Sequence, residues 1–116
     1  MIIIEYCPER YSIKATGHAN YAPYGQDIVC AAASTLIQTL ALCIEGYSSG
    51  LYEEPTIIIG EKTEISCKPL PEREREISLL YWYCICGLDC LAERYPKNIG
   101  ITTLWHQGVN HTESRP

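Results

Sequence analysis

The sequence predicts a single-domain α+β fold in which a small mixed sheet packs with two long helices. Two long stretches carry apolar residues at the three-and-four spacing of a helix, and shorter apolar or alternating stretches around them are typical of strands. Along the chain the order is ββαββαβ, as expected for a sheet that carries helices on its faces. The chain has 116 residues, 47% of them hydrophobic, which is enough to bury one core. We expect residues 1–105 to form this domain and the polar residues 106–116 to be a disordered tail.

The first two strands are expected at Met1–Tyr6 and Tyr11–Thr16. The first is rich in isoleucine and the second alternates apolar with polar residues, while Pro8 and its charged neighbours supply the turn between them. The segment Ala19–Gln26 contains several loop formers and has no periodicity. We therefore expect a hairpin followed by an exposed, mobile loop.

The clearest helix prediction covers Asp27–Glu45. Asp27 is a favoured N-cap residue, and Gly46 stands where a glycine commonly ends a helix. At 100° per residue, Cys30 falls at the border of the apolar face, one turn from the helix start. The predicted core face comprises Val29, Ala33, Leu36, Ile37, Leu40, Cys43 and Ile44.

The second half of the chain is expected to contain a second hairpin, a second long helix and one further strand, without any internal sequence repeat. Thr56–Ile59 and Thr63–Cys67 are expected to pair around a turn at Gly60. A second long helix is expected to begin at Pro71 or Glu72 and to end near Arg94, because Pro96 stops it. Asn98–Trp105 is the expected last strand. The predicted core positions of the second helix are Ile77, Leu80, Cys84, Leu88, Leu91 and Tyr95.

The outward side of the second helix carries large groups for a solvated face, namely Trp82, Tyr83, Cys86 and Cys90. Either the sheet buries both sides of this helix or a second subunit covers it. A metal site is not expected from Cys84, Cys86 and Cys90, because only the last two share a face and two ligands do not complete a zinc site. We predict no metal and no cofactor, and we expect Cys43 and Cys84 to pack in the core.

Charge and cysteine content restrict the class of protein. A formal net charge of −5 argues against binding to nucleic acid, which requires a basic surface. The N-terminal MIIIEYCPER has no basic region, and Glu5 interrupts its apolar run, so no signal peptide is expected. No apolar run is expected to span a membrane. We therefore expect a cytoplasmic protein whose seven cysteines are free thiols.

Cys30 and His18 have the side chains that nucleophilic catalysis by a thiol requires. The thiolate is the reactive form, and unpaired N–H groups at a helix start favour an anion there. An imidazole accepts the thiol proton and later donates a proton to the leaving amine. Taken alone, Cys30 would more often be a small buried hydrophobe and His18 a hydrogen-bonded residue at a strand end.

The residues around this pair have roles that the sequence leaves open. Asp27 either caps the helix, which we favour, or orients His18 as the third member of a triad. Tyr21 and Tyr24 either cover the edge of the core or contact a substrate. The glycines at positions 17 and 25 are expected to let the loop move. Backbone N–H groups at the helix start, including that of Cys30, are the expected donors to an oxyanion.

The stretch GHANYAPYGQDIVCAAAS resembles the signature of the Prp family of ribosomal-processing cysteine proteases. That signature is a G-H-A triplet, a short variable loop that ends in G-x-D-I-V-C-A, and a serine four residues past the cysteine. It fixes residue types together with the interval from histidine to cysteine. The matching positions here are Gly17, His18, Ala19, Gly25, Asp27, Ile28, Val29, Cys30, Ala31 and Ser34.

This resemblance implies a small, homodimeric, cytosolic endopeptidase with Cys30 as nucleophile and His18 as general base. Members of the family remove a short N-terminal extension from a large-subunit ribosomal protein and cut after aromatic residues. Related phage and prophage sequences are thought to trim capsid or scaffold proteins, so a phage head protein is the alternative partner. The resemblance also implies that Ser34 faces the substrate and that the loop Asn20–Gln26 closes on it. A noncatalytic module that binds a ribosomal or phage structural protein is the alternative from a different class.

Overall fold

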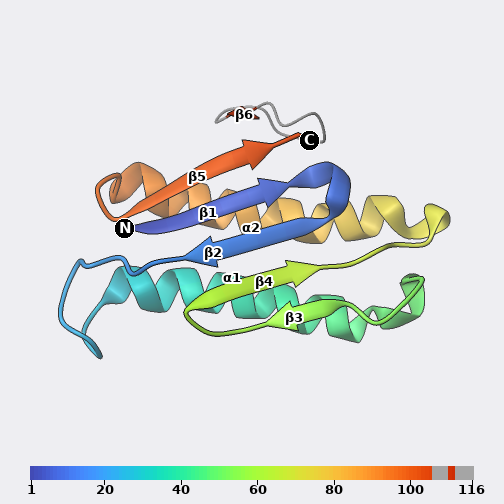
Figure 1. The fold of residues 1–116 in the computed structure, drawn as a ribbon, viewed down its shortest axis with the longest axis horizontal. Coiled ribbons are helices and arrows are strands. Elements are labelled where there is room, and N and C mark those ends of the chain that lie inside the picture. The colour runs from blue at the N-terminus through green and yellow to red at the C-terminus, as the bar shows by residue number, and fades with distance from the viewer. Residues whose placement is uncertain (106–109, 112–116) are drawn as a thin grey trace.

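A mixed sheet and a pair of helices form two layers in the computed structural model, which describes residues 1–105 and 110–111. The sheet has six strands in the order β3-β4-β2-β1-β5-β6, and both helices lie against the same face of it (Figure 1). The predicted α+β class and the mixed sheet are confirmed. The strands are β1 Ile2–Cys7, β2 Ser12–Thr16, β3 Thr56–Ile58, β4 Lys62–Ser66, β5 Ile99–Leu104 and β6 Asn110–His111; the helices are α1 Ile28–Gly46 and α2 Glu74–Arg94.

Strand β1 lies near the centre of the sheet. It pairs antiparallel with β2 and parallel with β5, so that Ile4 stands beside Ala15 on one side and Ile101 on the other. Successive side chains of a strand point to opposite faces. Ile4 is therefore buried beneath the helices, whereas Ile3 is 41% exposed on the opposite face. The alternation of burial along β1 thus shows which face of the sheet carries the core.

Helix α1 begins where the sequence predicts, with Asp27 as its N-cap residue. Its buried stripe consists of Val29, Ala33, Ile37, Leu40, Ala41 and Ile44. The prediction that Cys43 packs in the core is wrong, because its side chain is exposed. The stripe is rotated toward Ala41, which leaves Cys43 on the solvent flank and Leu36 half-buried against α2.

Helix α2 begins later than predicted, because residues Pro71–Arg73 form a short 3-10 turn before it. The burial of Cys84 in the core is confirmed. Tyr81 is buried as well, although a tyrosine carries a hydroxyl that needs a partner. That hydroxyl lies 3.5 Å from the carbonyl oxygen of Ile65, which it reaches as a hydrogen-bond donor. The buried positions are Ile77, Tyr81, Cys84, Ile85 and Leu88, while Leu80, Leu91 and Tyr95 are half-buried.

The sheet does not cover both sides of α2. Tyr83 is 72% exposed and Cys90 is exposed, while Trp82 and Cys86 are half-buried. The first explanation offered for this apolar side is therefore wrong, and cover by a second subunit stays a prediction.

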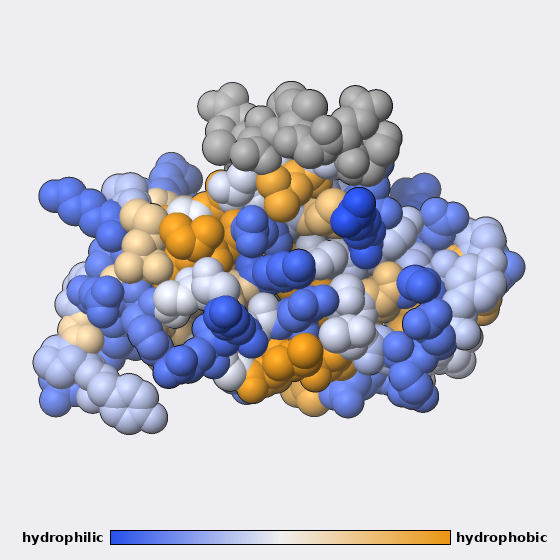
Figure 2. All heavy atoms as spheres, in the orientation of Figure 1, coloured by the Kyte–Doolittle hydropathy of each residue, from blue (hydrophilic) through white to orange (hydrophobic). Residues whose placement is uncertain are grey.

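The second face of the sheet has no helix on it among the described residues, and Figure 2 shows it as polar side chains with apolar patches between them. Ile58 is 53% exposed on this face. At the β5 edge, Thr103 and Leu104 pair with the two residues of β6. This strand falls in the segment expected to be a disordered tail, and the rest of that segment lies outside the described residues.

Helix α1 is the one helix of the described residues that is long and apolar enough to cross a membrane by length and composition. The expectation that no apolar run reaches such a length is wrong by this test. The core helix of a globular protein passes the same test, and the inner stripe of α1 is part of the core here. The test therefore assigns no membrane location.

Candidate active site

Cys30 lies in the first turn of α1, half-buried, with its neighbours fixed by the helix cap. One carboxylate oxygen of Asp27, Oδ1, accepts hydrogen bonds from the backbone N–H groups of Val29 at 3.0 Å and of Cys30 at 2.9 Å. These are donors that the start of a helix leaves without partners inside the helix. The cap therefore fixes the backbone that carries the thiol.

The other oxygen of Asp27 contacts the loop that precedes the helix. Oδ2 accepts hydrogen bonds from the N–H groups of Tyr21 at 2.9 Å and of Ala22 at 3.3 Å. Desolvation acts to raise the pKa of the Asp27 carboxyl, but these backbone donors outweigh it and hold that pKa below its ordinary value. Among the described residues, none of the hydrogen bonds of Asp27 goes to His18. The geometry favours the capping role over that of a triad acid.

The segment that carries His18 passes close to Cys30. Gly17 has a φ of +87°, and a Cβ at this position would overlap the backbone carbonyl oxygen of Met1. Beyond it, the N–H of Ala19 donates a hydrogen bond to Sγ of Cys30 at 3.3 Å. The His18 side chain is exposed, and within residues 1–105 no hydrogen bond joins it to Cys30. Both residues line one groove, and no hydrogen bond joins them among the described residues.

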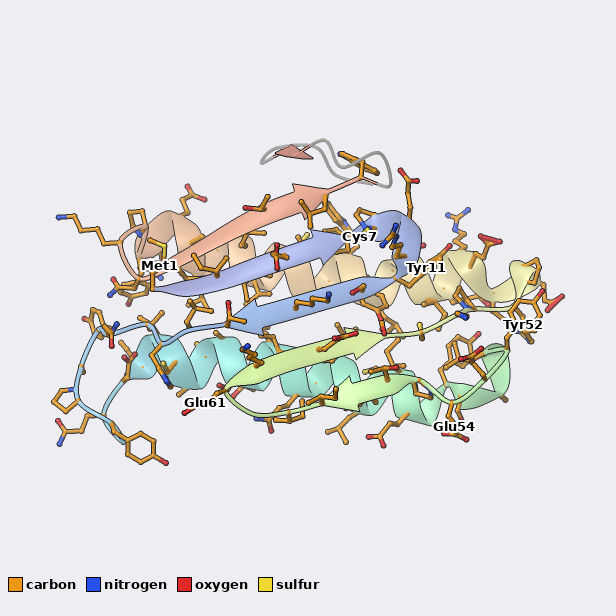
Figure 3. The ribbon with its side chains drawn as sticks, in the orientation of Figure 1. Met1, Cys7, Tyr11, Tyr52, Glu54 and Glu61 are labelled. Atoms are coloured by element: carbon orange, nitrogen blue, oxygen red, sulfur yellow. The ribbon has the colours of Figure 1, made fainter. Side chains whose placement is uncertain are left out.

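A groove of about 1020 Å³ contains the candidate residues. One wall of the groove is formed by the loop after β2 and by the first turns of α1, and another by the turn between β3 and β4. Glu61 lies at that turn, in front of α1 (Figure 3). The groove is lined by His18, Tyr24, Cys30 and Ser34, with Ile59 and Glu61 across from them.

The loop residues differ in where they lie. Ser34 and Tyr24 line the groove, and Tyr24 is fully exposed there. Tyr21 is not among the groove residues; its ring packs edge-on against Tyr95 at 5.2 Å between centroids. Gly25, a predicted hinge, has a φ of +85° and open space around it. Tyr21 therefore has a packing partner outside the groove.

The expected oxyanion donors have other partners in this structure. The N–H of Cys30 bonds to the Asp27 carboxylate, and the N–H of Ala31 bonds to the Asp27 carbonyl oxygen at 3.1 Å. The donor that faces the sulfur is instead the N–H of Ala19. A cap that uses the helix-start donors thus leaves the preceding loop to contact the thiol.

Sequence reasoning missed Asn98, whose side-chain amide donates a hydrogen bond to the carbonyl oxygen of Ala19 at 2.8 Å. The two residues are 79 positions apart, and no local pattern connects them. Ile59 and Glu61 were missed for the same reason, because only the sheet order brings the turn at Gly60 to the start of α1. Among residues 1–105, 110 and 111 no group of three or more His, Cys, Asp or Glu side chains could hold a metal ion.

Comparison with known proteins gives consistent matches along most of the chain. Residues 1–100 match the family model described as cysteine protease Prp. The ribosomal processing cysteine protease Prp of Bacillus subtilis is 30% identical over 100 residues, which cover 79% of this chain and 84% of that protein.

Solved structures give the same result. The ribosomal processing protease Prp from S. aureus, in complex with a covalently linked product peptide, superimposes with a TM-score of 0.74 at 25% identity, covering 89% of this chain and 99% of that one. The same S. aureus protease in complex with a substrate peptide has a TM-score of 0.67 at 25% identity, with the same coverage. A Streptococcus mutans protein at 24% identity and a TM-score of 0.67, covering 90% of this chain and 93% of that one, shows likeness of fold alone.

Proposed function

Because this chain belongs to the Prp family of cysteine proteases, we propose that Cys30 is its nucleophile and His18 its general base. The observation that carries this assignment is the position of the Cys30 sulfur. It lies within hydrogen-bonding distance of the Ala19 N–H, in a groove that His18 also lines. The other thiols of the described residues lie outside that groove. Cys30 is therefore the thiol that a substrate in the groove can reach.

The reaction proceeds in two stages. The thiolate of Cys30 attacks the carbonyl carbon of the scissile bond after His18 has accepted the thiol proton. The carbon–nitrogen bond then breaks, and the imidazolium returns that proton to the leaving amine, which leaves a thioester on the sulfur. Water, deprotonated by His18, attacks the thioester, and the acid product and the free thiol are released. The imidazole is exposed and belongs to the residue directly before Ala19, whose N–H contacts the sulfur.

The substrate we propose is the N-terminal segment of a large-subunit ribosomal protein, cut after an aromatic residue. The names of the Bacillus subtilis and S. aureus relatives state ribosomal processing, which supports this substrate class. The groove supports it as well, because its inner walls include the apolar side chains of Ala33, Ile37 and Ile59. A phage head protein is the alternative substrate, and neither the groove nor the relatives favour it.

We further propose that the enzyme acts in the cytoplasm as a homodimer. Large apolar side chains are exposed on the outer surface of the helices, as is typical of a surface that a second subunit covers. Leu42 is 69% exposed, Tyr83 72% and Leu79 44%. Sedimentation equilibrium at micromolar concentration should give the dimer mass. A monomer mass at that concentration would contradict the dimer and leave the assignment of the nucleophile unaffected.

Peptide cleavage tests the assignment directly. A synthetic peptide with the N-terminal extension of the ribosomal protein, incubated with the wild type, should be cut at one bond, and Cys30→Ser and His18→Ala should each abolish the cut. Cys43→Ser is the matched control, since it removes an exposed thiol from the same helix and should cleave at the wild-type rate. Cleavage by Cys30→Ser at the wild-type rate would refute the assignment. Binding of the peptide by the wild type without cleavage would instead identify a noncatalytic binding module.

A further inference from the structure

The turn that joins α2 to β5 holds the catalytic segment from outside the groove. The side-chain amide of Asn98 donates to the carbonyl oxygen of Ala19 at 2.8 Å, and Tyr95 packs against the ring of Tyr21. The backbone of Asn98 is itself fixed. Its N–H donates to the carbonyl oxygen of Tyr95 at 2.9 Å, and its carbonyl oxygen accepts the N–H of Ile2 at 2.9 Å. Asn98 therefore connects α2 and the start of β1 to the loop at the active site.

Ala19 is held at three points. Its side chain is 1% exposed, its carbonyl oxygen accepts the Asn98 amide, and its N–H donates to Sγ of Cys30. A residue whose side chain, carbonyl and N–H are all engaged has little freedom in φ and ψ. The N–H groups of Val29, Cys30 and Ala31 are bonded to Asp27. The orientation of the Ala19 N–H is therefore more important for a hydrogen bond to the Cys30 sulfur than it would be at an uncapped helix start.

We propose that Asn98 is a positioning residue of this protease, which orients Ala19 so that its N–H donates to the Cys30 sulfur and keeps His18 beside the thiol. The inference rests on the proposed function of Cys30 and His18. A hydrogen bond to a thiolate is charge-assisted and so stronger than one to a neutral thiol. Asn98 is not among the residues that line the groove, and it acts through the backbone of Ala19.

The rate at which iodoacetamide alkylates Cys30 tests this role. It is measured between pH 6 and pH 8.5, with each thiol quantified by peptide mass mapping because the chain has seven cysteines. Asn98→Ala removes the donor, and Asn98→Leu removes it while keeping a similar volume and adding no charge, in case the smaller side chain impairs folding. Both should lower the alkylation rate of Cys30 near pH 6.5 about tenfold, as expected for the loss of a hydrogen bond to a charged group. Both should lower kcat for peptide cleavage with little change in KM.

Ile99→Val is the matched control. It removes a methylene from the buried neighbour of Asn98, so it lowers the melting temperature without removing a donor to Ala19. Its Cys30 alkylation rate should equal that of the wild type. Rates in both Asn98 variants within twofold of the wild type, or an equal fall in Ile99→Val, would overturn the positioning role and leave Cys30 as the nucleophile. A wild-type Cys30 that reacts no faster than the exposed Cys43 would overturn the proposed function itself, and this inference with it.

Discussion

Replacing Gly17 by alanine should destabilise the domain and displace the active-site segment. Gly17 combines a φ of +87° with a backbone so close to Met1 that a Cβ would overlap its carbonyl oxygen. This oxygen belongs to the peptide group that precedes β1, and the N–H of the same group, from Ile2, donates to the carbonyl oxygen of Asn98, so the oxygen cannot move aside as the end of a flexible side chain can. The substitution therefore forces the chain to shift at the residue directly before His18.

The size of the effect follows from these two features. A left-handed conformation costs a non-glycine residue about 1–2 kcal/mol. Overlap with fixed backbone adds about 1–3 kcal/mol, and the lower entropy of the unfolded alanine chain recovers about 0.4–1 kcal/mol. A net loss of about 2–4 kcal/mol corresponds to a fall in Tm of roughly 10 °C for a domain of this size.

Two further glycines separate the contributions. Gly25 has a φ of +85° but open space, whereas Gly46 lies at the end of α1 with open space and no positive φ. In thermal unfolding followed by circular dichroism, Gly25→Ala should lose about 1 kcal/mol, and Gly46→Ala should match or slightly exceed the wild type. Peptide cleavage should fall most in Gly17→Ala. Equal melting temperatures for the Gly17 and Gly25 variants would refute the argument from backbone overlap.

Two other predictions concern titration and thiol access. Since the pKa of Asp27 is lowered in the folded state, its stabilising effect is present above the ordinary carboxyl pKa and is lost as pH falls through the folded value. The difference in urea midpoint between the wild type and Asp27→Asn should therefore be clear at pH 7 and should disappear near pH 2, and a difference independent of pH would contradict this. Burial raises the pKa of the Cys84 thiol to about 12. Under native conditions near pH 8, Cys84 should therefore stay unmodified while the exposed Cys43 and Cys90 are alkylated. Mass mapping that finds Cys84 modified at a rate similar to theirs would contradict its burial.

The elements of the fold were predictable because their signals are local. The isoleucine-rich run at Ile2, Ile3 and Ile4 predicts the first strand, and Asp27 caps the helix through N–H groups two and three residues ahead of it. The rotation of α1 on the sheet was not predictable in this way. Cys43 and Ala41 both lie near the predicted apolar face, and the packing of α1 against the sheet and α2 decides which of them is buried.

The candidate site likewise contains residues that the sequence predicts and residues that it does not. His18, Asp27 and Cys30 come from one short stretch, so their residue types and spacing carry a signal. Asn98 and Glu61 reach the same site only because β5 pairs with β1 and because β4 pairs with β2. A single asparagine before a strand, or a glutamate in a turn, has no distinguishing neighbours in sequence. Residues of this kind become visible only once the sheet order is known.

The position of Asp27 has a consequence for how the thiol is activated. By bonding the N–H groups of Val29 and Cys30, the carboxylate occupies the helix-start donors and adds a negative charge beside the thiol. These two N–H groups therefore donate to the Asp27 carboxylate and not to the sulfur. In the proposed mechanism the compensating donor is the N–H of Ala19, which belongs to the loop rather than the helix. Because Asp27 also holds that loop through Tyr21 and Ala22, we expect a displacement of the loop to change the reactivity of Cys30 as well as access to the groove.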